Sequence, residues 1–148
     1  MRIRIALGLV VFAACLSWTE TGRAQTAVPA PTLRLPSGES VRNLNGDWDV
    51  TIENYGLKAH DGSYTNVYRI TQTGASFSAI RLRDNPPPSV AKTGSTSLRG
   101  EMDKDGFKRL EIVTGQGLIY PSKGQFSEDG RKLDIDNGSV MRLTLIRK

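Results

Sequence analysis

The sequence predicts an all-β protein built as one antiparallel up-and-down β-barrel of about eight strands. Apolar and polar residues alternate with a period of two in segment after segment, and no window repeats apolar residues at helical spacing. Tight-turn signals separate these segments, namely Asp105-Gly106, Asp129-Gly130 and Asn137-Gly138. A meander of short strands must protect its edges, and closure into a barrel does so. A two-sheet β-sandwich is the alternative.

The N-terminus is typical of a secretory signal peptide. Arg2 and Arg4 give a basic start, residues 5–16 are almost continuously apolar, and Gly22-Arg23-Ala24 fits a signal peptidase site. We therefore expect residues 1–24 to be removed and the mature protein to be periplasmic or secreted. The apolar run is shorter than the ~20 residues of a spanning helix, so no transmembrane segment is expected in the mature form.

Cys15 leaves a second possibility open. Together with the apolar residues before it, Cys15 resembles a bacterial lipobox, in which the cysteine is acylated and the product is an outer-membrane lipoprotein. Cys15 is the only cysteine of the chain, so the mature domain is expected to fold without a disulfide.

The charge of the mature chain argues against a nucleic-acid partner. The whole sequence carries a formal net charge of +5, but Arg2, Arg4, Arg23 and Glu20 lie in the signal peptide, so removal lowers it to +3. The mature chain has no long run of residues with the same charge, and an exported protein seldom meets nucleic acid.

Residues 25–42 precede the domain and contain three prolines, with neither a helical nor a strand period. We expect a flexible, extended leader there. The β-barrel domain is then expected to span residues 43–148.

The first strand is expected within residues 44–53. Leu44, Gly46, Trp48, Val50 and Ile52 share one face, and polar residues occupy the other. Further strands are expected in residues 67–73, 76–82, 98–103, 107–114, 123–127, 133–136 and 139–147. Gly74-Ala75 marks a hairpin between the second and the third.

Two long connections stand out among the tight turns. Residues 83–94 carry three consecutive prolines, and residues 55–66 form the other long loop. Long loops in compact domains are often functional, and we expect these two to rim one end of the barrel.

A Gly-x-Trp on the first strand, followed by a meander that ends in an arginine-bearing strand, resembles the calycin superfamily of lipocalin-like and avidin-like barrels. The resemblance implies that Trp48, with Gly46 before it, lies across a closed barrel end, and that Arg142 or Arg147 stacks over the indole. Val50 stands where the avidin branch has an asparagine, which disfavours biotin. Small bacterial protease inhibitors of similar size carry a disulfide that this chain cannot form.

An eight-stranded barrel is just wide enough either to be packed with side chains or to hold one small ligand. Six residues are candidates for contact with such a ligand: Trp48, Tyr68, Gln72, Phe77, Arg81 and Tyr120. For Trp48 we expect a structural role first and ligand contact second.

Catalytic and metal signals are weak. His60 is the only histidine and lies beside Asp61, but no spacing assembles a nucleophile with them. One histidine without a cysteine in the domain cannot supply the usual zinc ligands, and residues 103–106 have the opening of a calcium loop without its terminal glutamate. We expect a hairpin turn there, no catalytic residues, no metal and no cofactor.

These observations predict an exported, non-enzymatic β-barrel. Its partner is expected to be a small hydrophobic or amphipathic molecule, or an envelope protein. The alternative is an inhibitor or accessory subunit that uses the N-terminal leader, and a barrel enzyme is the least favoured hypothesis.

Overall fold

The structure is a computed structural model and describes residues 30–148. The expected signal peptide, its cleavage site, Cys15 and the first part of the leader lie outside the described residues.

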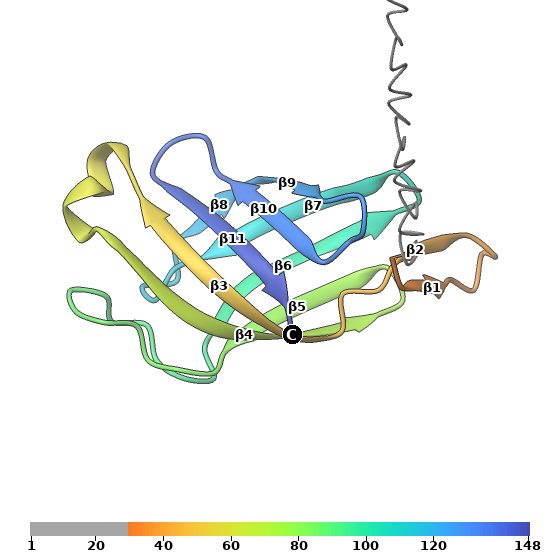
Figure 1. Ribbon diagram of the computed structural model, residues 1–148, viewed down its shortest axis with the longest axis horizontal. Helices are drawn as coiled ribbons and strands as arrows, with labels where there is room; N and C mark the ends of the chain where they lie inside the picture. Colours follow the sequence, from red (N-terminus) through yellow and green to blue (C-terminus); the bar gives the residue numbers. More distant parts are fainter. Residues whose placement is uncertain (1–29) are drawn as a thin grey trace, which may run out of the picture.

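The described chain is all-β and forms a nearly closed antiparallel barrel (Figure 1). The strands of its main sheet are β3 (Gly46–Asn54), β4 (Ser63–Thr73), β5 (Ser76–Arg81), β6 (Thr96–Asp103), β7 (Gly106–Val113), β8 (Ile119–Pro121), β9 (Lys123–Phe126), β10 (Lys132–Asp136) and β11 (Met141–Arg147). A single continuous sheet in the order β8-β7-β6-β5-β4-β3-β11-β10-β9 confirms the barrel prediction over the sandwich.

Strands β8 and β9, the two ends of this sheet, lie next to each other because they belong to one run of chain. β8 pairs with β7, and after Ser122 the chain continues as β9, which pairs with β10. The Ser122 N–H donates to the Leu110 carbonyl across 2.9 Å at this junction. With β8 and β9 taken as one kinked strand, the sheet is the eight-strand meander that the sequence predicts.

The barrel interior is packed with apolar side chains rather than hollow along its length. The alternation of β3 places Trp48, Val50 and Ile52 inward, each at most 1% exposed. Opposite strands contribute further buried residues, among them Leu98, Leu110, Ile135, Leu143 and Leu145. Any ligand space must therefore lie at an end of the barrel.

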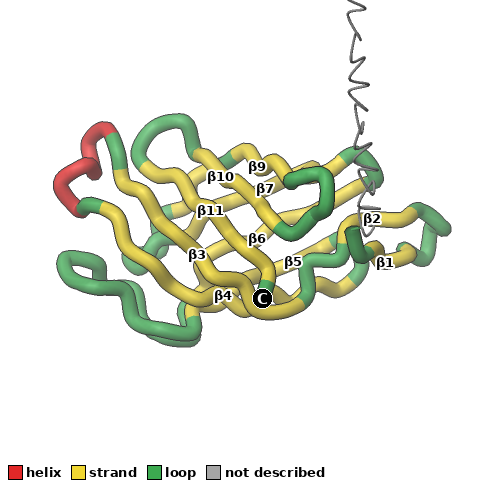
Figure 2. The backbone as a smooth tube through the Cα atoms, in the orientation of Figure 1, coloured by secondary structure: helices red, strands yellow, loops and turns green. Residues whose placement is uncertain are grey.

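The described part of the leader differs from the expected extended segment. β1 (Thr32–Arg34) and β2 (Ser40–Arg42) form a hairpin. Val41 is only 2% exposed, and Leu33 and Leu35 pack against the barrel core. These apolar contacts stabilise strands that are too short and too rich in neighbouring proline to show a period in the sequence. Figure 2 shows the hairpin at the end of the barrel away from the 3₁₀ helix η1 (Gly56–Asp61).

Strand β4 begins at Ser63, four residues before the expected start, so the first long loop is shorter than expected. The alternation pattern does not predict these first residues of β4, because the polar Asn66 occupies an inward position where an apolar residue is expected. Asn66 is only 2% exposed. Within residues 30–148, no helix has the length and apolar character needed to cross a membrane.

Candidate functional site

One end of the barrel is filled around Trp48. The indole is fully buried, and its Nε1 donates to the Leu44 carbonyl across 3.0 Å. The Arg147 guanidinium lies 4.7 Å from the centroid of the indole ring and donates to the carbonyls of Asn45 and Asn43. Burial lowers the pKa of Arg147 from its ordinary value. Gly46 opens β3 next to these groups with a φ of 126°, in the region that favours glycine.

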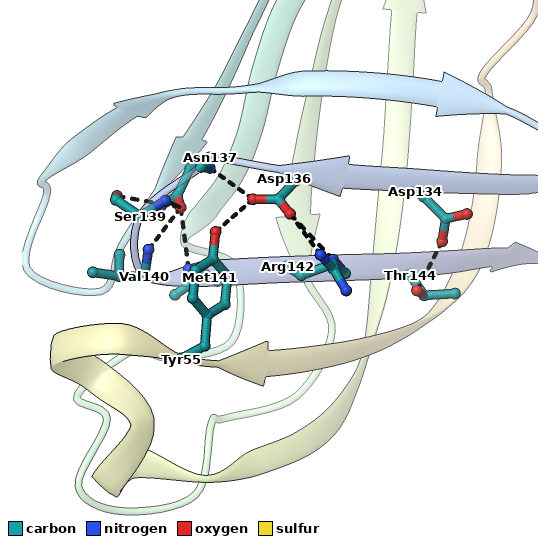
Figure 3. Close-up of polar contacts among 10 residues, drawn as sticks. Tyr55, Asp134, Asp136, Asn137, Ser139, Val140, Met141, Arg142 and Thr144 are labelled. Carbon is teal, nitrogen blue, oxygen red and sulfur yellow. Dashed lines mark hydrogen bonds and ion pairs between the residues drawn. The ribbon is translucent and has the colours of Figure 1, made fainter.

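Arg142, the other arginine considered for this position, lies elsewhere. Its guanidinium pairs with Asp136 across 3.0 Å on the outer face of the sheet (Figure 3), and its side chain is 55% exposed. The two residues lie on opposite faces of β11 because their positions differ by an odd number. Arg147 shares the inward parity of Met141, Leu143 and Leu145, and this parity is a sequence signal that separates the two arginines.

Gln72 and Phe77 also lie toward the Trp48 end. The Gln72 side chain accepts from the Leu44 N–H across 2.7 Å and donates to the carbonyls of Arg42 and Gly74, so it attaches the hairpin to the barrel. Phe77 packs against Phe107, with ring centroids 5.7 Å apart. Neither residue lines the cavity described next.

A cavity of about 350 Å³, here called the rim pocket, lies at the other end of the barrel. Polar residues of its lining include Lys58, His60, Asp61, Tyr64, Tyr68, Arg81 and Asn85. Apolar residues of its lining include Pro86, Pro88, Val90, Ile112 and Met141. Lining from both η1 and residues 83–94, here called the proline loop, confirms that the two long loops rim the same end, on the left in Figure 1.

Tyr55 anchors η1 at the rim. Its N–H donates to the Val140 carbonyl across 2.9 Å, and its hydroxyl donates to Asp136 Oδ1 across 2.6 Å (Figure 3). This hydrogen bond is the main cause that lowers the pKa of Asp136 and raises that of Tyr55. The next residue, Gly56, has a φ of 56°, and a Cβ there would lie 2.6 Å from the Ser139 carbonyl oxygen.

Two buried asparagines fix the proline loop. Asn66 Nδ2 donates to Asn85 Oδ1 across 2.7 Å, and Asn85 Nδ2 donates to the hydroxyls of Tyr64 and Ser89 across 2.9 and 3.2 Å. Sequence reasoning missed both asparagines. The sequence does carry a signal for Asn66, because this polar residue has the same inward parity as Tyr64 and Tyr68. Asn85 lies in a loop that has no periodic pattern.

Arg81 forms the buried polar wall of the rim pocket and is only 4% exposed. Its Nη1 donates to Ser95 Oγ and to the Thr96 carbonyl across 2.7 and 2.9 Å. Its Nη2 donates to the Val113 carbonyl across 2.8 Å. These three neutral acceptors, from the start of β6 and the end of β7, hold the guanidinium in one orientation.

One cross-strand row connects the filled end with the rim pocket. In the strand register Arg147 is opposite Trp48, Trp48 is opposite Tyr68, and Tyr68 is opposite Arg81. Tyr68 is 3% exposed, and burial raises its pKa, an effect that the positive charge of Arg81 partly offsets. The ligand candidates Tyr68 and Arg81 therefore meet in the pocket, whereas Trp48, on the strand next to Tyr68, does not line it.

Tyr120 and His60 occupy the periphery. The Lys58 ammonium lies 5.8 Å from the centroid of the Tyr120 ring, but Tyr120 is not part of the pocket lining. The His60 side chain is 75% exposed and its Nε2 lies 3.1 Å from the Asp61 carboxylate. Ser89 Oγ, a hydroxyl of the lining, accepts from Asn85 and from the Ala91 N–H, so no base contacts it in these interactions.

Residues 103–106 form the β6–β7 turn, as the Asp-Gly signal predicts, and the Asp105 N–H donates to Asp103 Oδ1. In the described part of the chain, no three histidine, cysteine or acidic side chains gather into a group that could hold a metal ion.

A second hollow of about 590 Å³ lies beside the β6–β7 turn and β9, and its lining includes Arg42, Lys104 and Lys123. Arg42 is only partly buried and stacks over Phe126 at 4.8 Å. The rim pocket is the stronger site because it combines a fixed, buried cation with apolar walls.

Comparison of the chain with models of protein families, with curated proteins and with solved structures finds no match.

Proposed function

We propose that the protein is an exported, non-enzymatic barrel of the calycin type that binds one small amphipathic molecule in the rim pocket. The observation that carries this proposal is the cavity of about 350 Å³ between the two long loops, above a packed barrel interior. Its volume lies in the ~300–1,000 Å³ range of small-molecule sites, and apolar walls with a few convergent polar groups are their usual lining.

The stacking of Arg147 over Trp48 supports the calycin-like assignment. It reproduces the arrangement that the resemblance implies for the closed end of such a barrel. The packing of Trp48 also supports a structural role for the indole, with the ligand at the opposite end.

Native mass spectrometry of the protein purified from the envelope of the cells that make it tests the proposal. We expect a retained small molecule at a ratio of one per chain. Val90→Trp should reduce the occupied fraction, because Val90 lines the pocket and is 57% exposed at its mouth. Ile146→Trp is the matched control, since Ile146 is 45% exposed on the outer face and should leave occupancy unchanged.

A retained protein in place of a small molecule would contradict this proposal and support the inhibitor or accessory-subunit alternative. That alternative draws no support from residues 32–42, because the hairpin they form packs on the barrel through Val41 instead of extending toward a partner.

Export is part of the proposal and has its own test. The mass of the mature protein should correspond to a chain that begins at Gln25. A mass increased by a diacylglyceryl group and a start at Cys15 would instead establish the lipoprotein form.

A further inference from the structure

Arg81 is a buried cation to which the described residues, 30–148, supply no counterion. It is 4% exposed, and its three hydrogen-bond acceptors within residues 30–148 are all neutral oxygens. Its Nε is buried without any partner in that part of the chain. A buried charge without an opposite charge is costly, so an anionic group of a ligand placed next to Arg81 would be stabilising.

The charges around the rim pocket also favour an anion. Among the lining residues, Arg81 and Lys58 are positive and Asp61 is the carboxylate. Asp61 lies 3.1 Å from the His60 imidazole, and no ion pair joins it to Arg81 in the described chain. With two cations and one carboxylate, the lining therefore has an excess of positive charge.

The phenol of Tyr64 adds a neutral donor. Burial is the main cause that raises its pKa to about 12, so it is protonated at neutral pH. Its oxygen accepts the hydrogen bond from Asn85, which leaves its own proton available for an acceptor in the pocket. Arg81 and Tyr64 are thus donors of the kind that bind an oxyanion.

The remaining walls are apolar. Pro88, Val90, Ile112 and Met141 line the same cavity and suit a hydrocarbon or aromatic body. We infer that the ligand is an amphipathic organic anion, whose oxyanion, a carboxylate or a sulfonate, is bound by Arg81 while its apolar body contacts these side chains. This inference rests on the proposed function and specifies its ligand class.

Two fluorescent probes with the same aromatic skeleton test the charge directly. 1-Anilinonaphthalene-8-sulfonate carries an oxyanion, and N-phenyl-1-naphthylamine is its uncharged counterpart. We expect the purified protein to bind the sulfonate at one site per chain with a Kd at least about tenfold lower than that of the uncharged probe, because hydrogen bonds to charged groups are the stronger ones. The Val90→Trp variant should weaken both.

Variants of Arg81 assign the effect to its guanidinium. Arg81→Gln should raise the Kd of the sulfonate at least about tenfold and change that of the uncharged probe by less than about twofold. Arg83→Gln removes the same charge two residues along, from an exposed side chain that does not line the pocket, and should change neither Kd appreciably.

NMR on the unmodified protein covers the case in which Arg81→Gln does not fold. The sulfonate should shift the Nε–H signal of Arg81 and the uncharged probe should not. Equal affinity for the two probes, or an unchanged Arg81 signal on binding of the sulfonate, would overturn the oxyanion assignment and leave the proposed function intact. If neither probe binds, or if Val90→Trp does not weaken the binding of either probe, the proposed function loses support as well.

Discussion

Arg147 shows how one side chain completes a barrel end. Its guanidinium covers the indole of Trp48 and supplies donors to two backbone carbonyls, of Asn43 and Asn45, that precede the first barrel strand. The residue thus joins the last strand to the entry of the first. Loss of these donors leaves partly buried acceptors unpaired, which usually costs about 1–3 kcal/mol.

We therefore predict that Arg147→Leu lowers the free energy of unfolding by about 1–3 kcal/mol in urea titrations. Arg142→Leu is the control from the same strand and should cost less than about 1 kcal/mol, because an exposed ion pair contributes little. Equal losses in the two variants would contradict the role assigned to Arg147.

Tyr55 and Asp136 form a second connection at the residue scale, on the outer face of the barrel (Figure 3). The hydroxyl of Tyr55 is the first cause of the lowered pKa of Asp136, followed by the N–H of Gly138. Because the folded-state pKa lies below the unfolded one, the contribution of Asp136 to stability is present above the unfolded pKa of ~3.9 and is lost as pH falls through the folded pKa.

Tyr55→Phe should raise the pKa of Asp136 toward its ordinary value and reduce this stabilisation near neutral pH. An NMR titration of the Asp136 carboxyl carbon checks the direction. Tyr120→Phe is a control, since no hydrogen bond joins Tyr120 to Asp136 in the described chain. An unchanged Asp136 titration in Tyr55→Phe would show that the other donors alone set its pKa.

At the scale of elements, the β1–β2 hairpin belongs to the barrel core. Val41 is 2% exposed and packs with Leu44 and the barrel residues, whereas Val90 on the proline loop is 57% exposed. The two valines allow the same substitution in a buried and an exposed position.

Val41→Ala should lower the free energy of unfolding by about 2 kcal/mol, from the lost burial of two carbons and the cavity left behind. Val90→Ala should change it by less than about 0.5 kcal/mol. Thermal or urea unfolding of both variants measures the difference. If Val41→Ala lowers the free energy of unfolding no more than Val90→Ala does, the hairpin does not contribute to the core, and the expected flexible leader is the better description.

The elements that the sequence predicts best are those with a strict period of two and a tight turn. β3 is predictable because Trp48, Val50 and Ile52 alternate with polar residues, and β7 because the Asp105-Gly106 turn signal marks its start. The hairpin is not visible, since three-residue strands show no period. The sequence does not predict the kink at Ser122 either. The kink arises because β8 pairs with β7 while β9 pairs with β10, and this pairing depends on the tertiary structure.

The candidate site was predictable in part. Tyr68 and Arg81 occupy inward positions that the alternation identifies, and both line the rim pocket. Gln72 has the same parity but lies at the other end of β4, because the parity of a residue gives its face and not its height in the barrel. Asn85 depends on tertiary contacts of a loop, which no local pattern encodes.

At the scale of the molecule, the first long strand of the barrel pairs with its last strand. β11 pairs with β3 over its whole length, and the Lys148 N–H donates to the Asp47 carbonyl across 3.1 Å. The Asn43 N–H also donates to the Pro31 carbonyl, so the beginning of the described chain lies close to this same seam.

This adjacency makes the fold a candidate for circular permutation. A chain that starts at Asp105, is joined head to tail through a short glycine-serine linker between Lys148 and Ala30, and stops at Lys104 should regain the native circular dichroism spectrum, because chain breaks at exposed turns are tolerated. New ends at Ser122 should prevent folding, since that residue joins the two halves of the strand that completes the ring. Folding would then depend less on the order of the strands along the chain than on an intact peptide connection between β8 and β9.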